Sequence, residues 1–222
     1  MGGRPVAGAA RVFYEEIWRR KVREGPRPEA ATAIRETIVA PYIPSGARVL
    51  DVGCGTGKLF DLLPSPVRTV GVDVAWSALE VAHRRGHSVI RMDLDSPHLP
   101  FRDATFDCVS CLAVVEHLFD PNVLIREAAR VLVPGGTLIV LVPNIRQYYR
   151  MYQLLVRGRF PRTSGDPEGM DGGHLHYFTF SDVRELIENA GFSAIALTGT
   201  GGVRFLAPLR SLEILAIARK AG

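Results

Sequence analysis

One stretch, Arg48-Val-Leu-Asp-Val-Gly-Cys-Gly-Thr-Gly57, constrains the fold of this chain most. It joins a short apolar run, which is typical of a buried strand, to an acid and then to three glycines at alternate positions. Glycine allows the backbone to turn with positive φ and allows a ligand to approach main-chain amides without meeting a Cβ atom. The stretch therefore predicts a strand followed by a loop that binds a nucleotide-type cofactor through its backbone.

The spacing of the glycines narrows the choice of cofactor. Gly53, Gly55 and Gly57 form G-x-G-x-G, whereas the dinucleotide fingerprint G-x-G-x-x-G needs a glycine at position 58, where a lysine stands. A phosphate-binding loop would need a glycine at position 52 and a hydroxyl at position 59, and this chain has Val52 and Leu59. NAD is therefore the less favoured ligand, and a standard nucleotide triphosphatase loop is excluded.

Two acids follow apolar runs in this region, Asp51 after the first run and Asp73 after the second. An acid roughly 20 residues beyond the glycine loop, at the tip of the second strand, is where a carboxylate binds a ribose diol. Asp51 is suited to hold a cationic amine, directly or through water, while the loop amides and the start of the next helix suit a carboxylate. Together these groups describe an amino acid joined to a nucleoside.

The residues from Val49 to Gly57 resemble the first motif of the class I S-adenosylmethionine-dependent methyltransferases, and the resemblance extends over residues 45–220. The segment from His174 to Thr179 is similar to one in the methionine-biosynthesis and quinone-biosynthesis types of that family. The resemblance implies S-adenosylmethionine as the cofactor. It also implies a set of cofactor-binding residues, in which Asp95 is an alternative to Asp93 opposite the adenine: Asp51, Gly53, Gly55, Gly57, Asp73, Val74, Asp93, Leu94 and Cys111.

Short apolar runs alternate with helical stretches from residue 47 onward, which predicts a parallel sheet covered by helices. With the resemblance, the predicted fold class is α/β: a Rossmann-like, seven-stranded, mostly parallel sheet with helices on both faces and an antiparallel last strand. A capping pattern at Thr179-Phe-Ser-Asp182 predicts the start of one helix. Strands are expected near 47–52, 68–73, 88–93, 106–112, 136–142, 192–198 and 211–219, and further helices near 57–63, 76–85 and 121–132.

The chain divides into two expected parts. Residues 1–40 form a helical cap that covers the cofactor, and residues 41–222 form the S-adenosylmethionine-binding methyltransferase domain, in which residues 144–176 are a lid or substrate segment. The family often has a serine two residues after the ribose-binding acid, where it caps the next helix, but this chain has Ala75 followed by Trp76. Trp76 either lies against the adenine or fills the core beside the helix.

Two histidines are the catalytic candidates. Methyl transfer from a sulfonium is an in-line displacement, so a base is needed only when the acceptor must lose a proton. Glu116-His117 matches a recurrent pair of the family, and His117 is either that base or part of a structural tie to the helix that begins near Pro121. His174, on the lid, is the second candidate. His174 and His176 would share a face of an extended segment, but no cysteine lies nearby and no metal is expected.

Bulk composition limits the class of protein. A chain of 222 residues with 47% hydrophobic content can bury one sizeable core, and its apolar runs are too short for a transmembrane helix. The three cysteines are odd in number and the N-terminus has no signal-peptide core, so we expect a cytoplasmic protein.

Cys108 and Cys111 lie three apart on a predicted strand, so they should point to opposite faces.

Between Asn144 and Gly165 the chain has five arginines and no acid, interleaved with aromatic residues. This segment suits an anionic substrate, RNA or an anionic membrane surface, or else it is a solvated helix face.

We expect methyl transfer to a small or medium-sized acceptor, with O-, N- and C-methylation all open. The alternatives are an accessory or sensing subunit that binds the cofactor without catalysis, and a methyltransferase for RNA or a membrane-associated acceptor. The oligomeric state is left open.

Overall fold

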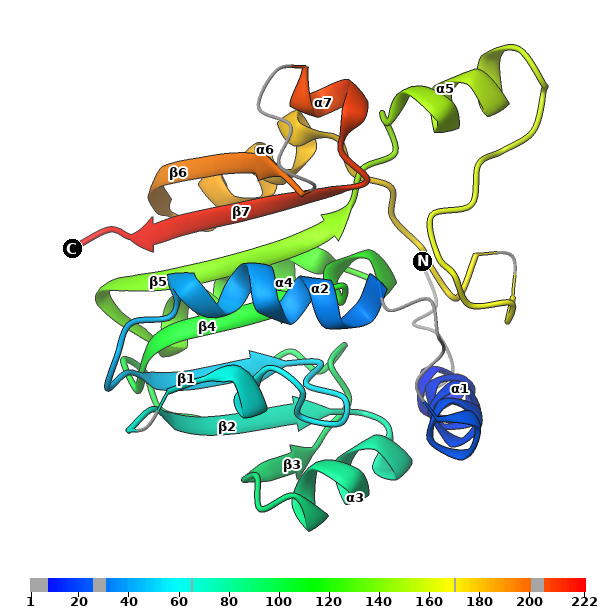
Figure 1. Cartoon of the computed structure of the whole chain (residues 1–222). Helices are drawn as coiled ribbons and strands as arrows, with labels where there is room; N and C mark the ends of the chain where they lie inside the picture. The colour runs from blue at the N-terminus through cyan, green and yellow to red at the C-terminus, as the bar shows by residue number, and fades with distance from the viewer. Residues whose placement is uncertain (1–7, 26–30, 65, 170, 201–205) are drawn as a thin grey trace, which may run out of the picture.

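The computed structural model describes residues 8–25, 31–64, 66–169, 171–200 and 206–222. Within them, seven strands form one sheet in the order β3-β2-β1-β4-β5-β7-β6 (Figure 1). All neighbouring strands are parallel except for the two pairs that β7 makes with β5 and β6. The predicted seven-stranded sheet with an antiparallel last strand is therefore confirmed. The strands are β1 (Arg48–Val52), β2 (Arg68–Asp73), β3 (Val89–Arg91), β4 (Phe106–Leu112), β5 (Leu132–Pro143), β6 (Phe192–Gly199) and β7 (Glu213–Lys220).

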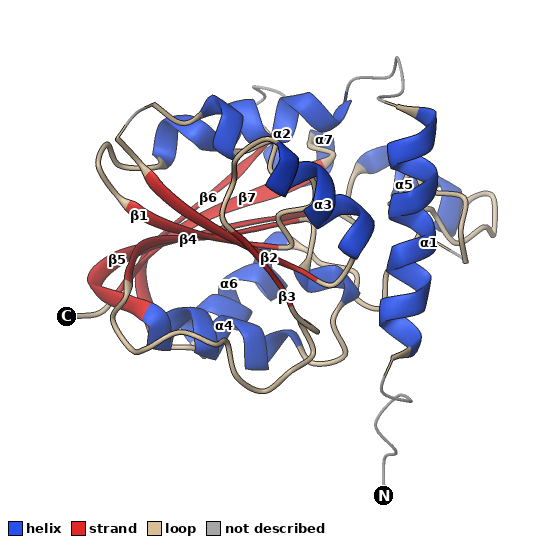
Figure 2. Ribbon diagram, turned by 90° about the horizontal axis from the view of Figure 1, so that it is seen from below, coloured by secondary structure: helices blue, strands red, loops and turns tan. Residues whose placement is uncertain are grey.

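Helices cover both faces of this sheet, as expected (Figure 2). One face carries α4 and α6, the other carries α2, α3 and α7, while α1 and α5 lie beyond the carboxyl ends of the parallel strands. No helix in the described ranges combines the length and the apolar character that crossing a membrane requires. The helices are α1 (Ala9–Glu24), α2 (Ala31–Val39), α3 (Trp76–Arg84), α4 (Pro121–Val131), α5 (Tyr148–Leu155), α6 (Phe180–Glu188) and α7 (Ala207–Arg210), and the 3-10 turns are η1 (Ala40–Tyr42), η2 (Phe60–Leu62) and η3 (Val115–His117).

Each face of the sheet has its own apolar core, because alternate side chains of a strand point to opposite faces. Cys111 belongs to the core beneath α4 and α6, together with Ile187. Cys108 belongs to the other core, together with Val39 of α2 and Leu79 of α3. The two cysteines are buried, free and on opposite faces, which confirms the prediction from their spacing.

The connection between β1 and β2 differs from the expectation. The prediction of a helix near residues 57–63 is wrong, because only the 3-10 turn η2 forms there. Gly57 has a φ of 75°, outside the helical range, and Pro64 follows closely, so too few residues remain to nucleate an α-helix. A Cβ atom on Gly57 would also lie 2.6 Å from the ring of His87. The chain therefore passes from the glycine loop to β2 through a tight connection.

The first turn of α3 is capped by a side chain from α1. Ala75, at the N-cap of α3, provides no side-chain acceptor. The Glu15 carboxylate instead accepts hydrogen bonds from the backbone nitrogens of Trp76, at 2.6 Å, and Ser77, at 3.3 Å. A negative charge is stabilised there by the unsatisfied amides and the helix dipole. The Trp76 side chain is 53% exposed, so the alternative in which it fills the core is wrong.

Replacing Glu15 by alanine should therefore weaken the attachment of α1 to the sheet. We expect Glu15→Ala to lower the free energy of unfolding by about 1–2 kcal/mol, because two amides lose their acceptor. Thermal unfolding followed by circular dichroism measures this change. Glu16→Ala is the matched control, since Glu16 is the exposed neighbour on the same helix. Equal losses in the two variants would show that Glu15 is not the cap that holds α3.

Candidate active site

The carboxyl ends of β1, β2 and β4 lie side by side at one edge of the sheet, and buried polar groups gather there. Asp51, near the end of β1, is 4% exposed and accepts a hydrogen bond from the Ser110 hydroxyl of β4 at 2.7 Å. Burial raises the pKa of Asp51 to about 7, against the lowering effect of Ser110, and the charges of Glu36 and Asp73 add to the increase. The site thus contains a buried carboxyl group whose ionised form lacks a cationic partner among these neighbours.

The glycine loop leaves no room for side chains. Gly53 and Gly55 have φ values of 73° and 52°, in the left-handed region that favours glycine. A Cβ atom on Gly53 would lie 2.2 Å from Val114, in the turn after β4, and one on Gly55 would lie 2.6 Å from the Trp18 ring of α1. The backbone of the loop therefore fits closely between the β4 turn and α1.

Asp73 is the last residue of β2 and joins the glycine loop to α3. Its carboxylate accepts hydrogen bonds from the backbone nitrogens of Gly55 and Ala75, both at 2.9 Å. Burial raises the pKa of Asp73, while these amides oppose the increase. Each carboxylate oxygen has a further lone pair, so Asp73 can hold the loop and still accept from a ligand hydroxyl.

The acids beyond β3 are both exposed, and neither is free of protein contacts. Asp93 accepts a hydrogen bond from the backbone nitrogen of Asp95 at 3.1 Å. Asp95 accepts one from the backbone nitrogen of Phe119 at 2.7 Å and so connects this loop to the turn after β4. Leu94, between them, packs partly against the core. Asp95 is the better fixed of the two acids, but both stand at the same edge.

Val74 and Cys111, two other residues predicted to bind the cofactor, have buried side chains. Val74 is buried, and its carbonyl accepts a hydrogen bond from the Arg91 side chain at 3.0 Å, which holds the start of the α3 connection. Cys111 is fully buried in the core, where burial raises the pKa of its thiol. The side chain of Cys111 therefore packs in the core.

The helix α1 crosses this edge and is joined to the lid segment. Arg20 forms ion pairs with Glu168 at 2.5 Å and with Asp166 at 3.1 Å, and Lys21 pairs with Asp166 at 2.7 Å. The Tyr14 hydroxyl donates to the carbonyl of Gly173 at 3.3 Å. Sequence reasoning placed a helical cap here but did not identify these charged partners, because no local pattern relates residues so distant in the chain.

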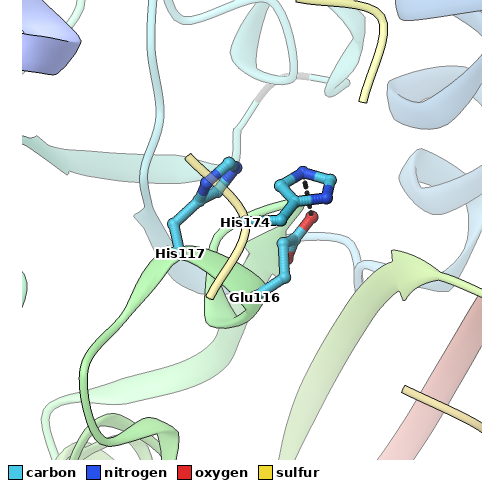
Figure 3. Close-up of side chains that lie close together, drawn as sticks. All are labelled: Glu116, His117 and His174. Carbon is cyan, nitrogen blue, oxygen red and sulfur yellow. Dashed lines mark ion pairs between the residues drawn. The ribbon is translucent and has the colours of Figure 1, made fainter. Parts of the chain in front are cut away.

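The structure brings the two catalytic candidates together (Figure 3). The rings of His117, on η3, and His174, near the end of the lid segment, have centroids 4.6 Å apart. Glu116 lies beside them, with its Oε1 atom 3.9 Å from Nε2 of His174. The backbone carbonyl of Glu116 accepts hydrogen bonds from the amides of Leu175 and His176, at 2.8 and 3.0 Å. The Glu116-His117 turn is therefore joined by hydrogen bonds to the end of the lid segment.

The ring of His174 is held at its Nδ1 atom by two residues of the lid segment. Its Nδ1 atom lies 2.6 Å from the Thr163 hydroxyl and 3.4 Å from the Asp171 carboxylate. Asp171 is buried and also accepts from the backbone nitrogens of Thr163 and Ser164, both at 2.8 Å. These supporting residues were missed from the sequence, since nothing in their spacing marks them. His176 does not pair with His174, because its Nε2 atom lies 3.3 Å from the Phe119 carbonyl.

The basic segment after β5 is divided between the interior and the surface. Arg150 of α5 donates to the backbone carbonyls of Asn144, at 2.6 Å, and Leu212, at 2.9 Å, so it is a structural residue. Tyr148 and Tyr149 are 62% and 55% exposed, so neither side chain packs in the core. A shallow cavity of about 450 Å³ beside α5 is lined in part by Tyr149 and Phe160.

Comparisons with known proteins agree with this architecture. A family model described as a methyltransferase domain matches residues 22–197. The chain is 29% identical over 179 residues to the demethylmenaquinone methyltransferase of Staphylococcus saprophyticus, covering 72% of this chain and 77% of that protein. It is 40% identical over 111 residues to the probable tRNA methyltransferase 9B of Homo sapiens, covering 49% of this chain but only 24% of the human protein.

Solved structures share the whole fold. An S-adenosylmethionine-dependent methyltransferase from Thermotoga maritima, described as a possible histamine N-methyltransferase, aligns with a TM-score of 0.66. The alignment covers 95% of this chain and 97% of that chain, at 19% sequence identity, and therefore compares folds alone. The family model spans the glycine loop, both buried acids and the Glu116-His117 turn. The chain belongs to the methyltransferase domain family and has the fold of the class I S-adenosylmethionine-dependent methyltransferases.

Proposed function

We propose that the edge formed by β1, β2 and β4 holds S-adenosylmethionine in a defined orientation. Asp51 binds the ammonium group, the amides of the glycine loop bind the carboxylate, and Asp73 accepts from the ribose hydroxyls. Asp93 or Asp95 faces the adenine amino group. The fit is supported by the close-packed glycine backbone and by the buried Asp51 carboxyl, which gains a cationic partner. The bound cofactor supplies a methyl group on an electrophilic sulfonium.

The acceptor in this proposal is a small or medium-sized molecule whose hydroxyl or amine loses a proton. The observation that carries the proposal is the meeting of His117 and His174 at the strand edge that also carries Asp51 and Asp73. Nδ1 of His117 is buried and has no hydrogen-bond partner in the described structure, so it is available to an acceptor proton. Holding the acceptor in line with the methyl group supplies much of the remaining catalysis.

An acceptor panel tests this function directly. The purified chain is incubated with S-adenosylmethionine and with phenols, hydroquinones, amines and thiols, and formation of S-adenosylhomocysteine is measured. We expect turnover with a hydroxyl or amine acceptor, and we expect His117→Ala and His174→Ala to lower kcat by about 10²-fold or more with cofactor affinity retained. Tight cofactor binding without turnover on any acceptor would instead favour the accessory or sensing subunit.

The assignment of Asp73 predicts a loss of cofactor binding. Asp73→Ala should weaken S-adenosylhomocysteine binding by about tenfold or more, because the ribose and the glycine loop both lose a carboxylate acceptor. Isothermal titration calorimetry measures the affinity. Asp107→Ala is the control, since Asp107 is also a strand acid but pairs with Arg48 at the opposite end of the sheet. If both variants bind like the wild type, Asp73 does not hold the ribose.

The raised pKa of Asp51 predicts proton release on binding. At pH 6 this carboxyl, with a pKa near 7, is mostly protonated in the free protein, and a ligand ammonium favours its ionised form. Binding should therefore release a proton near pH 6, and the release should vanish by about pH 9, where the carboxyl is already ionised.

Calorimetry in buffers of different ionisation enthalpy measures this proton release. Asp51→Asn is the reference variant. It still reports protons released by the ligand itself, but it has no carboxyl group at position 51 to release one. The assignment is contradicted if the variant releases as many protons at pH 6 as the wild type.

A nucleic-acid acceptor is the second candidate. It is supported by the exposed tyrosines of α5, by the neighbouring exposed Arg157 and Arg159, and by the name of the human relative. If RNA is the acceptor, Arg157→Glu and Arg159→Glu should weaken transfer-RNA binding and flatten its dependence on salt, whereas Arg126→Glu on α4 should not. Equal binding by all three variants would exclude this candidate.

A further inference from the structure

Three polar side chains converge at the acceptor side of the site without satisfying one another. Glu116, His117 and His174 each offer a ligand atom, and these atoms all lie within 4.8 Å of one another. Glu116 is 1% exposed, and in the described structure neither of its carboxylate oxygens has a hydrogen-bond partner; the same holds for Nδ1 of His117. A buried carboxyl group whose two oxygens lack partners is costly, so this arrangement points to a missing cationic ligand.

The surroundings of His174 support the same conclusion independently. Its Nδ1 atom is engaged by the Thr163 hydroxyl and the Asp171 carboxylate, which leaves Nε2 directed toward Glu116 (Figure 3). A metal-bound histidine characteristically has its second ring nitrogen held by a carboxylate or another polar group, which fixes the tautomer and orients the ring. Asp171 itself is anchored by backbone amides, so the support for the His174 ring is preformed.

We propose that Glu116, His117 and His174 bind a divalent transition-metal ion of the zinc type. Two imidazoles and one carboxylate favour zinc and its neighbours over magnesium and calcium, which prefer oxygen ligands alone. A tetrahedral zinc site requires ligand atoms about 3.3 Å apart, so rotation of these side chains must close the present separations. Three protein ligands leave a fourth position open, as in catalytic rather than structural zinc sites.

The ion changes how the acceptor loses its proton. When the ion is bound, the lone pair of His117 is occupied, and a hydroxyl at the open position loses its proton to water because its oxygen is polarised by the ion. The oxygen then attacks the methyl carbon, and the carbon–sulfur bond breaks with its electron pair remaining on sulfur. This step rests on the proposed methyl transfer, whereas binding of the ion does not.

Zinc binding is measured on the full chain, without a polyhistidine tag, after treatment with a chelator. Calorimetric titration with zinc chloride should show one site per chain, and magnesium should bind at least 100-fold more weakly. Glu116→Gln and His174→Gln should each weaken zinc binding by about 100-fold or more. His176→Gln is the matched control, since it makes the same chemical change two residues from His174 and outside the cluster. Zinc should raise the Tm of the wild type and of this control only.

Two further measurements keep the test decisive if a variant folds poorly. Thr163→Val keeps all three ligands and removes a hydrogen bond behind His174, so it should weaken zinc binding about 10–100-fold. The visible spectrum of the cobalt-loaded protein should be that of a four-coordinate site without thiolate absorption, since the cysteines lie outside the cluster.

The site is ruled out if the wild type binds no zinc, if His176→Gln loses as much affinity as His174→Gln, or if cobalt shows thiolate ligation. Cofactor and acceptor are absent from these titrations. A negative result therefore leaves the methyl-transfer proposal standing, and an unsuccessful acceptor panel leaves the metal site standing.

Discussion

The contact between the Asp73 carboxylate and the backbone nitrogens of Gly55 and Ala75 is the interaction on which the rest of the site depends. It joins the loop after β1 to the start of α3, so that two separate strand ends form one rigid edge. Because Asp73 is buried, its charge is held by amides rather than by water. The loop and the acid are thereby placed before any ligand arrives, which lowers the cost of binding.

The helix α1 connects several parts of the site. Glu15 caps α3, Trp18 lies against Gly55, and Arg20 pairs with the acids of the lid. One helix therefore contacts the glycine loop on one side and the lid segment on the other. The lid in turn holds His174 through Thr163 and brings it beside His117. The cluster of Glu116, His117 and His174 is thus assembled from segments that are far apart in the chain.

The sequence predicted those parts of the site that depend on local patterns. Asp51 and Asp73 end apolar runs, and the carboxyl ends of parallel strands necessarily meet at one edge of the sheet. The prediction of a helix near 57–63 was wrong, because Gly57 has a positive φ and Pro64 follows closely. The apolar residues between them are too few to form an α-helix. Sequence patterns did not mark Ser110, Glu15 or Asp171, because their roles depend on partners in other strands, helices or loops.

By itself the sequence predicted a parallel sheet covered by helices and a glycine loop suited to a nucleotide-type cofactor, because strand periodicity, glycine spacing and the positions of acids act over a few neighbouring residues. Only the tertiary structure decided that Glu15 replaces the missing helix cap and that Glu116, His117 and His174 share one buried cluster. Such pairings join residues dozens of positions apart, and they exist only once packing of the whole chain has fixed the relative positions of α1, η3 and the lid.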